Sequence, residues 1–461
     1  MTIKAKRRSG VLLHINSLHG PGPAGTLGEE SYQFITILSA AGQSIWQMLP
    51  IHPPDPLNNP YSSLTAFGGN TDIMTYDRST LVDTAAFDKW HEDNKDWISD
   101  WALFKVIKQT HDHTPWHSWP KPLRERAAEA LRSFRSAHDE QIREVILEQF
   151  LFDLEWSKLH AYASSKNIKL FGDMPFFVAW DSADVWANRH LFNIAGNGRP
   201  THVAGVPPDY FSKTGQRWGN PLYVWDAHAK DGFKWWRRRL EITLRRFDLV
   251  RIDHFRAIEQ YWSIPAKHRT ARKGRWLDGP GMHLMKALAQ VAGPHQLVAE
   301  DLGIIHDSII ALRQEFDIPG MAVLHFAFDS KSTVNNIHHP DHMHEDVICY
   351  PGTHDNDTTV SWFNETKNAR KPHLRRRRER VKALMRKGER VHHTLIRTAM
   401  ESRARTAICS MQDLLGLGGD ARMNTPGRLQ GNWRWRMTEG QLEQVDWNWL
   451  ENVTRVTERT R

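Results

Sequence analysis

The chain has 461 residues, of which 40% are hydrophobic and 25% are charged, and its formal net charge is +8. These values are typical of a soluble globular protein with one large domain or two to three smaller ones. They exclude a disulfide-stabilised scaffold, because the only two cysteines, Cys349 and Cys409, lie in apolar runs and are expected to be buried thiols.

The N-terminal segment is basic, with Lys4, Lys6, Arg7 and Arg8, but the apolar run that follows covers only residues 11–13. A secretory signal peptide needs a longer apolar region, and no stretch of the chain approaches the length that crosses a membrane. The sequence therefore predicts a cytoplasmic protein without a membrane partner.

Short apolar runs that are typical of buried strands recur along the whole chain. In chain order they cover residues 11–15, 45–50, 168–173, 249–253, 297–300, 321–328, 347–350 and 406–411. Helical patterns lie between most of them, at residues 31–41, 142–164, 233–247, 284–291, 308–316 and 392–403. A capping box formed by Thr438 and Gln441 predicts the start of a last helix, with Leu442, Val445, Trp449 and Val453 along one side.

Eight alternations of strand and helix predict an α/β fold of the (β/α)8 TIM-barrel class, without a separate C-terminal β-domain. A doubly wound open sheet is the alternative, but such a sheet normally has a glycine-rich phosphate-binding turn after its first strand. Residues 16–21 read N-S-L-H-G-P and form no such turn.

A bare barrel needs about 250 residues, so roughly 200 residues of this chain must lie in insertions. The two largest insertions follow the second and third predicted strands. Residues 85–165 are predicted to form a helical insertion subdomain, and residues 175–225 a loop-rich insertion that forms a wall and lid of the active site. The whole chain, residues 1–461, is therefore interpreted as a single catalytic domain.

Basic residues are concentrated in residues 370–390, which include four consecutive arginines at 375–378. A nucleic-acid-binding patch is one interpretation of this segment. The solvated face of an amphipathic helix is favoured instead, because Leu374, Val381 and Leu384 recur between the charges at roughly helical spacing. We therefore expect no nucleic-acid partner.

The most informative stretch, residues 248–256, reads D-L-V-R-I-D-H-F-R. The strand period of two places Arg251 and Asp253 on the same face, which in a parallel barrel points inward and reaches the catalytic mouth. An adjacent arginine is expected to lower the pKa of Asp253 and to keep this carboxylate available as a nucleophile. An ordinary buried salt bridge is the alternative interpretation.

Other acidic residues also stand where predicted strands end. Asp173 and Glu300 end the third and fifth runs, and Asp355 follows the seventh; His254 adjoins Asp253, and His354 adjoins Asp355. Carboxylates near a barrel core must be paired or hydrogen-bonded, so a set of four is hard to explain structurally.

Two facing carboxylates are what the cleavage of a glycosidic bond requires. Asp253 is the predicted nucleophile. Glu300 follows three apolar residues, and burial should raise its pKa so that it serves as the acid. Asp301 is expected to be a structural hydrogen-bond acceptor. Asp355 is expected to bind sugar hydroxyls, with His254 and His354 as donors, and the two catalytic acids to lie about 5 Å apart.

A metal site is the rival use of these histidines and acids, but no H-E-x-x-H or C-x-x-C spacing accompanies them. The sequence thus predicts neither a metal nor another cofactor. Twenty tryptophans are expected to lie mostly in the core, while a few that line a groove would suit sugar rings.

Ten stretches of the chain carry a resemblance to a known family. They are 9–14 (S-G-V-L-L-H), 46–50 (W-Q-M-L-P), 59–67 (N-P-Y-S-S-L-T-A-F), 172–188 (G-D-M-P-F-F-V-A-W-D-S-A-D-V-W-A-N), 205–223 (G-V-P-P-D-Y-F-S-K-T-G-Q-R-W-G-N-P-L-Y), 251–256 (R-I-D-H-F-R), 298–303 (V-A-E-D-L-G), 352–358 (G-T-H-D-N-D-T), 412–418 (Q-D-L-L-G-L-G) and 421–427 (A-R-M-N-T-P-G). They cover nearly the whole chain in order. By these stretches the chain resembles the 4-α-glucanotransferases (amylomaltase or disproportionating enzyme, glycoside hydrolase family 77), which are relatives of the α-amylases.

The resemblance implies a retaining transferase that passes segments of maltooligosaccharides or linear α-1,4-glucans to another sugar through a covalent glucosyl-aspartate. It implies Asp253 as nucleophile, Glu300 as acid/base and Asp355 as stabiliser of the transition state. The implied sugar-binding residues are Arg251, His254 and His354 at the cleavage point, Tyr61, Asp173 and Asn424 on the donor side, and Asp209 and Trp218 in a flexible loop over the groove.

The chain departs from the family pattern at few positions. Ala257 stands where glycine is usual, His325 where glutamine is usual, and residues 14–19 replace a loop that normally contains two prolines. Two other functions stay open at this point: an α-glucan hydrolase of the α-amylase type, which would use the same three acids, and a non-catalytic glucan-binding barrel, which would not need all three.

Overall fold

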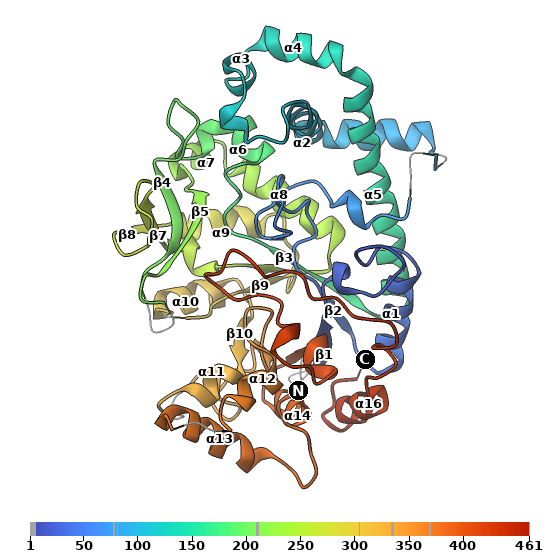
Figure 1. Cartoon of the computed structure of the whole chain (residues 1–461), viewed down its shortest axis with the longest axis vertical. Helices are drawn as coiled ribbons and strands as arrows, with labels where there is room; N and C mark the ends of the chain where they lie inside the picture. Colours follow the sequence, from blue (N-terminus) through green and yellow to red (C-terminus); the bar gives the residue numbers. More distant parts are fainter. Residues whose placement is uncertain are drawn as a thin grey trace.

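Eight parallel strands form the central sheet of the computed structural model, which describes residues 6–76, 79–80, 82–208, 212–303, 305–332, 336–367 and 370–460. The strand order is β10-β11-β12-β1-β2-β3-β6-β9. Their bounds are β1 Arg8–Leu12, β2 Ile45–Gln47, β3 Lys169–Met174, β6 Leu249–Ile252, β9 Leu297–Ala299, β10 Gly320–Val323, β11 Val347–Tyr350 and β12 Thr406–Ser410. Each of the eight predicted runs overlaps one of these strands, so the predicted barrel is confirmed (Figure 1).

The barrel is nearly closed between β9 and β10, the two strands at the ends of the sheet order. The backbone N–H of Ala299 donates to the carbonyl of Pro319 at 2.8 Å. The Asp301 carboxylate accepts the N–H of Met321 at 2.8 Å and pairs with Arg313 at 3.2 Å. Asp301 is therefore a structural hydrogen-bond acceptor, as the sequence predicted, and it closes the gap in the sheet.

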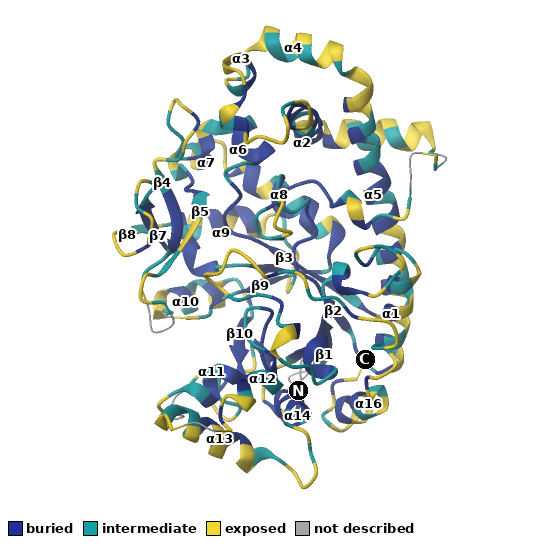
Figure 2. Cartoon of the chain, viewed as in Figure 1, coloured by how far each residue is buried: buried dark blue, intermediate teal, exposed yellow. Residues whose placement is uncertain are grey.

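The barrel interior is a packed apolar core, because alternate residues of each strand point inward. Its buried side chains include Leu12, Ile45, Phe171, Leu249, Val298, Met321, Ile348, Tyr350 and Ile408. The intervening residues, such as Val250 and Ile252, belong to the larger core between the strands and the surrounding helices. Figure 2 shows these strands as buried, whereas exposed residues gather on the outer helices. Arg251 thus shares the inward face with Leu249, as expected from the strand period.

Helices surround the sheet and form the first insertion. Their bounds are α1 Glu29–Ala40, α2 Thr84–Thr110, α3 Lys121–Arg124, α4 Ala128–Ala137, α5 Asp139–Ser165, α6 Ala183–Ala187, α7 Trp225–Lys230, α8 Lys234–Arg246, α9 Gly281–Ala289, α10 Asp307–Glu315, α11 Leu324–Asp329, α12 Thr359–Asn364, α13 Pro372–Leu384, α14 Val391–Glu401, α15 Met411–Leu414 and α16 Trp447–Val456. The insertion between β2 and β3 consists largely of α2 and α5, of 27 residues each, with α3 and α4 between them at the top of Figure 1. Short 3-10 helices cover Ile15–Ser17, Thr71–Ile73, Trp116–Ser118, Arg189–Leu191, Phe255–Ile258 and Gly419–Ala421.

A second, antiparallel sheet lies beside the barrel, and the sequence did not predict it. Its strands are β4 His202–Val206, β5 Gln216–Pro221, β7 Gln260–Pro265 and β8 Arg275–Asp278, in the order β5-β4-β7-β8. The predicted loop-rich insertion at 175–225 therefore holds two strands of a sheet. Glycine and proline in this stretch concealed them, because both residues are depleted from strands in general.

Three predicted boundaries were wrong. The first strand ends at Leu12 and not at residue 15. The sixth run divides, because β10 ends at Val323 and α11 begins at Leu324. The last helix begins at Trp447, where the Asp446 side chain accepts the N–H of Trp449 at 2.9 Å. The Thr438 N–H donates to the Gln441 side chain at 3.0 Å, which is one of the two bonds of a capping box. This bond lies within a turn, and no helix begins there.

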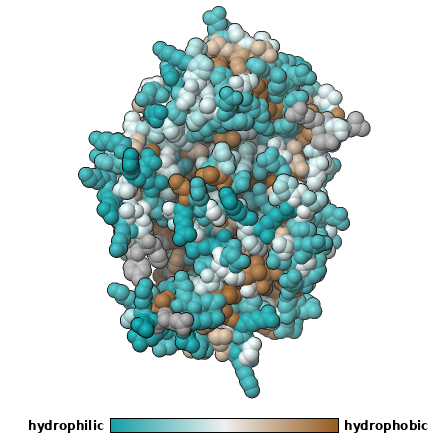
Figure 3. Space-filling view, in the orientation of Figure 1, coloured by the Kyte–Doolittle hydropathy of each residue, from teal (hydrophilic) through white to brown (hydrophobic). Residues whose placement is uncertain are grey.

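The remaining expectations concern the surface and the cysteines. Cys349 and Cys409 are free and buried, as predicted. The basic segment forms α13, with Arg377 and Val381 as its buried residues, so the predicted amphipathic helix is confirmed. Within the described residues, no helix is long and apolar enough to cross a membrane. Figure 3 shows a largely hydrophilic face with small scattered hydrophobic groups.

Candidate active site

The predicted site residues meet at the carboxyl ends of the barrel strands. Asp173 is the last residue but one of β3, Asp253 directly follows β6, and Glu300 directly follows β9. Asp173 pairs in register with Arg251, and Ile252 with Ala299, so the ends of these three neighbouring strands are level. Asp355 lies in the turn after β11. All the acids therefore come from one end of the barrel, the end that carries active sites in this fold.

Arg251 is the centre of a buried polar network. Its Nε donates to Asp173 Oδ1 at 3.0 Å and its Nη2 to Asp173 Oδ2 at 2.6 Å, which is a two-pronged, charge-assisted pair. The same Nη2 lies 3.1 Å from Asp253 Oδ1. The Arg251 and Asp173 side chains are 3% and 1% exposed, whereas Asp253 is 28% exposed. Asp253 is thus the member of this network that a bound molecule can reach.

Tyr61 and His354 extend the network toward the mouth. The Tyr61 hydroxyl donates to Asp173 Oδ2 at 2.6 Å and accepts from Arg251 Nη2 at 3.1 Å. His354 Nε2 lies 2.8 Å from the same hydroxyl. Because Tyr61 has one hydrogen to donate and Asp173 takes it, His354 must carry its proton on Nε2. The rings of Tyr61 and His354 stack with centroids 5.5 Å apart.

Glu300 is fixed by backbone groups. Its Oε2 accepts the N–H of His254 at 2.8 Å, and its Oε1 accepts the N–H of Leu302 at 3.1 Å. His254 has a φ of 50°, in the left-handed region that few side chains adopt. Since His254 is the residue after Asp253, these bonds tie the Glu300 carboxylate to the end of the neighbouring strand. The two acids follow paired residues of adjacent strands, which lie about 4.8 Å apart, and the separation of about 5 Å between their carboxyl groups stays a prediction.

The pKa of Glu300 is raised to about 7. Burial is the largest cause, and the charge of Asp301 adds to it, while Arg251 and the two backbone N–H donors oppose it. The expectation that burial raises this pKa is therefore confirmed. A carboxyl group with this pKa holds its proton through most of the weakly acidic range and can act as a general acid there.

The expected lowering of the Asp253 pKa by Arg251 was wrong as a net effect. Burial raises the pKa of Asp253, and although Arg251 opposes this rise, Asp173, Glu300 and Asp355 add to it. The main physical reason is burial, which disfavours the charged carboxylate, while the guanidinium that opposes it also makes two hydrogen bonds to Asp173. The acids Asp253 and Glu300 therefore compete for a proton. Arg251, which lies 3.1 Å from Asp253, favours the ionised form of this acid.

Asp355 is the most open of these acids, with a side chain 46% exposed. Asn424 Nδ2 donates to its Oδ1 at 2.6 Å, and His354 Nε2 lies 3.5 Å from the same oxygen. Trp433, which the sequence analysis did not single out, has its ring 5.5 Å from that of Tyr61. The segment after β12 thus supplies Asn424 and Trp433 to one wall of the site. The aromatic run N-W-R-W at 432–435 beside the predicted Asn424 was the available signal.

His254 and Trp218 face each other on another side of the site. Their ring centroids are 4.9 Å apart at an interplanar angle of 87°. Trp218 is 39% exposed, and burial lowers the pKa of His254 to about 3, so that His254 is neutral. Among the described residues, His254 Nε2 is buried without a hydrogen-bond partner. The other predicted loop residue, Asp209, lies outside the described residues.

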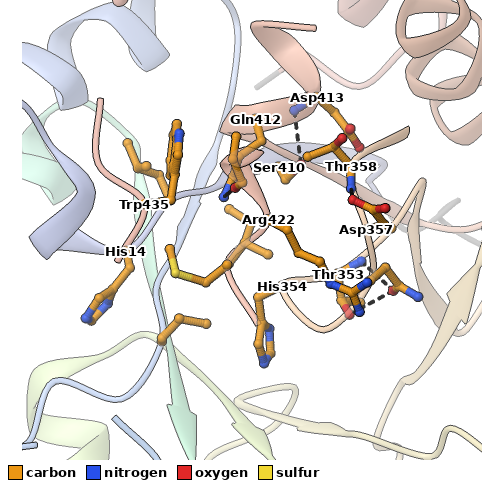
Figure 4. A pocket seen from close by; sticks show the side chains of 17 residues that line it. His14, Thr353, His354, Asp357, Thr358, Ser410, Gln412, Asp413, Arg422 and Trp435 are labelled. Carbon is orange, nitrogen blue, oxygen red and sulfur yellow. Dashed lines mark hydrogen bonds between the residues drawn. The ribbon is translucent and has the colours of Figure 1, made fainter. Parts of the chain in front are cut away.

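A small pocket adjoins His354 (Figure 4). His14, Thr353, His354, Arg422 and Trp435 are among its lining residues. Burial, with a smaller contribution from His354, lowers the pKa of His14 to about 3. The described residues contain no cluster of three or more histidine, cysteine or acidic side chains arranged to hold a metal ion.

Comparison with known proteins links this geometry to glucan chemistry. Residues 13–83 and 73–442 match the family model described as 4-alpha-glucanotransferase. The chain is 40% identical to the 4-alpha-glucanotransferase of Thermus thermophilus, with 98% of this chain and 99% of the relative covered. It is 38% identical to the chloroplastic/amyloplastic 4-alpha-glucanotransferase of Solanum tuberosum, with 94% and 82% covered. The amylomaltase from Streptococcus agalactiae in complex with acarbose has a similar structure, with a TM-score of 0.91, 32% identity, and 99% and 100% of the two chains covered.

Proposed function

We propose a retaining, double-displacement mechanism for this chain, on the premise that it belongs to the 4-alpha-glucanotransferase family and has 4-alpha-glucanotransferase activity on α-1,4-glucans. In the first step Asp253 attacks the anomeric carbon, the bond to the departing glucan breaks, and Glu300 gives its proton to the departing 4-oxygen. In the second step the 4-hydroxyl of an acceptor loses its proton to Glu300 and displaces Asp253. A maltooligosaccharide or a linear glucan serves as donor and as acceptor.

One observation carries this proposal. Asp253 and Glu300 follow neighbouring strands that end at the same level, and the surroundings of the two acids differ. Arg251 lies 3.1 Å from Asp253, which favours the ionised nucleophile. Glu300 accepts two backbone N–H groups and has a pKa of about 7. A pair of carboxyl groups whose environments separate their proton affinities is the arrangement that glycosidic chemistry uses.

The other residues of the site hold the donor sugar in this proposal. Asp355, fixed by Asn424, is placed to accept hydroxyl groups and to stabilise a distorted ring in the transition state. Tyr61 presents an aromatic face that suits the C–H side of a sugar. Arg251 and Asp173 act mainly by fixing the Tyr61 and Asp253 side chains from below. His354 donates its Nε2 proton within this group.

We assign acceptor selection to the insertion at 175–225, which acts as wall and lid of the active site. The insertion is part of a single catalytic domain of residues 1–461. Trp218 stands over His254 and is open to solvent, so it offers a ring for an acceptor sugar. Asp209 is proposed to act in the same insertion. Hydrolysis of α-glucans is the alternative, since water would use the same three acids. Transfer is favoured because the relatives are transferases over nearly their full length. We propose a cytoplasmic location.

Digestion of maltotriose distinguishes transfer from hydrolysis, because reducing ends stay constant in transfer and increase in hydrolysis. The covalent step is tested by rapid quenching with a maltosyl fluoride donor, followed by proteolysis and mass spectrometry. We expect the transferred sugar on a peptide that contains Asp253, as an acid-stable but base-labile ester. A sugar attached to another acid, or none under conditions of full turnover, would contradict the proposed nucleophile.

The rate should depend on pH through Glu300. This group must be protonated to assist departure, and its pKa is raised to about 7. The value of kcat/KM is therefore expected to fall as pH rises through about 7, by up to tenfold for each further pH unit. Initial rates on maltotriose between weakly acidic and weakly alkaline pH test this, with thermal unfolding at each pH as the control. A rate that stays constant well above this pKa in a folded protein would contradict the assignment.

A further inference from the structure

Arg422 makes contacts that the mechanism above does not use. Its Nε donates to the backbone carbonyl of Asn424 at 2.6 Å, and its Nη2 donates to the backbone carbonyl of Asp355 at 2.8 Å. Asn424 and Asp355 are the two residues whose side chains bond each other at 2.6 Å. The guanidinium thus bridges the main chains of two segments that are 69 residues apart and meet at the site.

The residues on either side reinforce this junction. Met423 is buried in the barrel interior beneath the site, and its carbonyl accepts the N–H of Trp433 at 2.8 Å. Asn424 donates its own N–H to the carbonyl of His354 at 3.1 Å. Residues 422–424 therefore hold the turn after β11 from one side. They bind main-chain carbonyls of this turn and one carboxylate oxygen of Asp355. Figure 4 shows Arg422 in the same pocket wall as Thr353 and His354.

Asp355 depends on this junction more than the other acids depend on their neighbours. Its side chain is 46% exposed, whereas Asp173 is 1% exposed and Glu300 is held by two backbone donors. A carboxylate at the open edge of the site has little packing to fix it. Its place must be set by the main chain that carries it, and Arg422 binds that main chain.

We infer that Arg422 is a positioning residue for glucan transfer: it fastens the main chain of Asp355 to the segment of Asn424 and so sets where the Asp355 carboxylate lies in the transition state. This inference rests on the proposed function of Asp355. Arg422 acts through Asp355 and Asn424 and does not itself touch the sugar. Lysine cannot replace it fully, since a single ammonium lacks the planar fork that reaches two carbonyls.

Replacing Arg422 by Met keeps much of the side-chain volume and removes the fork. We expect kcat for maltotriose disproportionation to fall by about 10- to 100-fold, the range typical of lost supporting hydrogen bonds and of misplacement by about 1 Å. KM should change by less than about threefold, because the interaction with Asp355 is needed mainly in the transition state. Arg422→Lys should give an intermediate loss of kcat. It is the variant to assay if Arg422→Met does not fold.

Arg436 provides a matched control in the same segment. Its guanidinium donates to the carbonyls of Leu18, Gly20 and Gly22, none of which belongs to a segment with a catalytic acid. Arg436→Met should lower the unfolding temperature as much as Arg422→Met does, with kcat within about twofold of the parent protein. An equal loss of kcat in both variants would show that the effect is general loosening and would overturn the inference.

A double-mutant cycle with Asn424→Ala supplies the decisive readout. If Arg422 acts through this junction, removing it from the Asn424→Ala protein should cost less than about threefold further in kcat. Fully additive losses, or a wild-type kcat in Arg422→Met, would overturn the inference. Asp355→Asn distinguishes the proposed function from the positioning role. An active Asp355→Asn protein would refute the proposed function, whereas an inactive one beside a normal Arg422→Met protein would refute the positioning role alone.

Discussion

Asp253→Asn is expected to lower kcat for glucan transfer by about 10⁴- to 10⁶-fold, the loss typical of a removed nucleophile. The amide has nearly the shape of the carboxylate but cannot form the ester with the anomeric carbon. The fold should persist, because Arg251 keeps its two hydrogen bonds to Asp173. Initial rates on maltotriose measure the loss, and calorimetric titration with a maltooligosaccharide should show binding within about tenfold of the parent protein.

Asp248, the residue just before the same strand, is a matched control. It precedes β6 at the opposite end of the barrel, where its Oδ2 accepts the N–H of Leu170 at 2.8 Å and lies 3.1 Å from His160 Nε2. Asp248→Asn should therefore lower stability and leave kcat nearly unchanged. If Asp253→Asn retained more than about a tenth of the parent rate, another group would have to be the nucleophile. The proposed mechanism would then be wrong.

Glu300→Gln is expected to lower kcat on maltotriose by about 10³- to 10⁴-fold, because neither the departing nor the incoming oxygen receives help with its proton. A maltosyl fluoride donor needs no acid to depart, so the first step should recover. Azide needs no base to attack, so adding it should restore turnover and yield an α-linked glycosyl azide, the configuration that a second inversion produces. Analysis of the sugar azide by nuclear magnetic resonance checks this result.

The neighbouring acid provides the control for this experiment. Asp301 closes the barrel by binding Met321 and Arg313, so Asp301→Asn should lower the unfolding temperature while the folded protein keeps most of its rate. Azide should have no effect on it. If azide failed to rescue Glu300→Gln with the fluoride donor, or rescued Asp301→Asn to the same extent, Glu300 would not be the acid/base residue.

The sequence alone predicted which residues stand at the mouth of the barrel. A strand of period two must place Arg251 and Asp253 on one face, and parallel strands must bring Asp173, Asp253 and Glu300 to the same end. These are consequences of local backbone geometry, so eight short apolar runs were enough to locate them. The boundaries were less certain, as at residues 321–328, where one apolar run serves first as strand and then as helix.

Only the tertiary structure decided how charge is divided within the site. Arg251 and Asp253 are two residues apart, yet the stronger partner of Arg251 is Asp173, which is 78 positions away. Burial chiefly raises the pKa of Asp253, and Asp173 adds to this rise, although the sequence suggested a lowered pKa. The contacts of Arg422, the stacking of Tyr61 on His354 and the antiparallel sheet likewise join segments that are distant in the chain. Local patterns fix the direction of a side chain, but its pKa and its partners depend on what the closed barrel brings within about 4 Å.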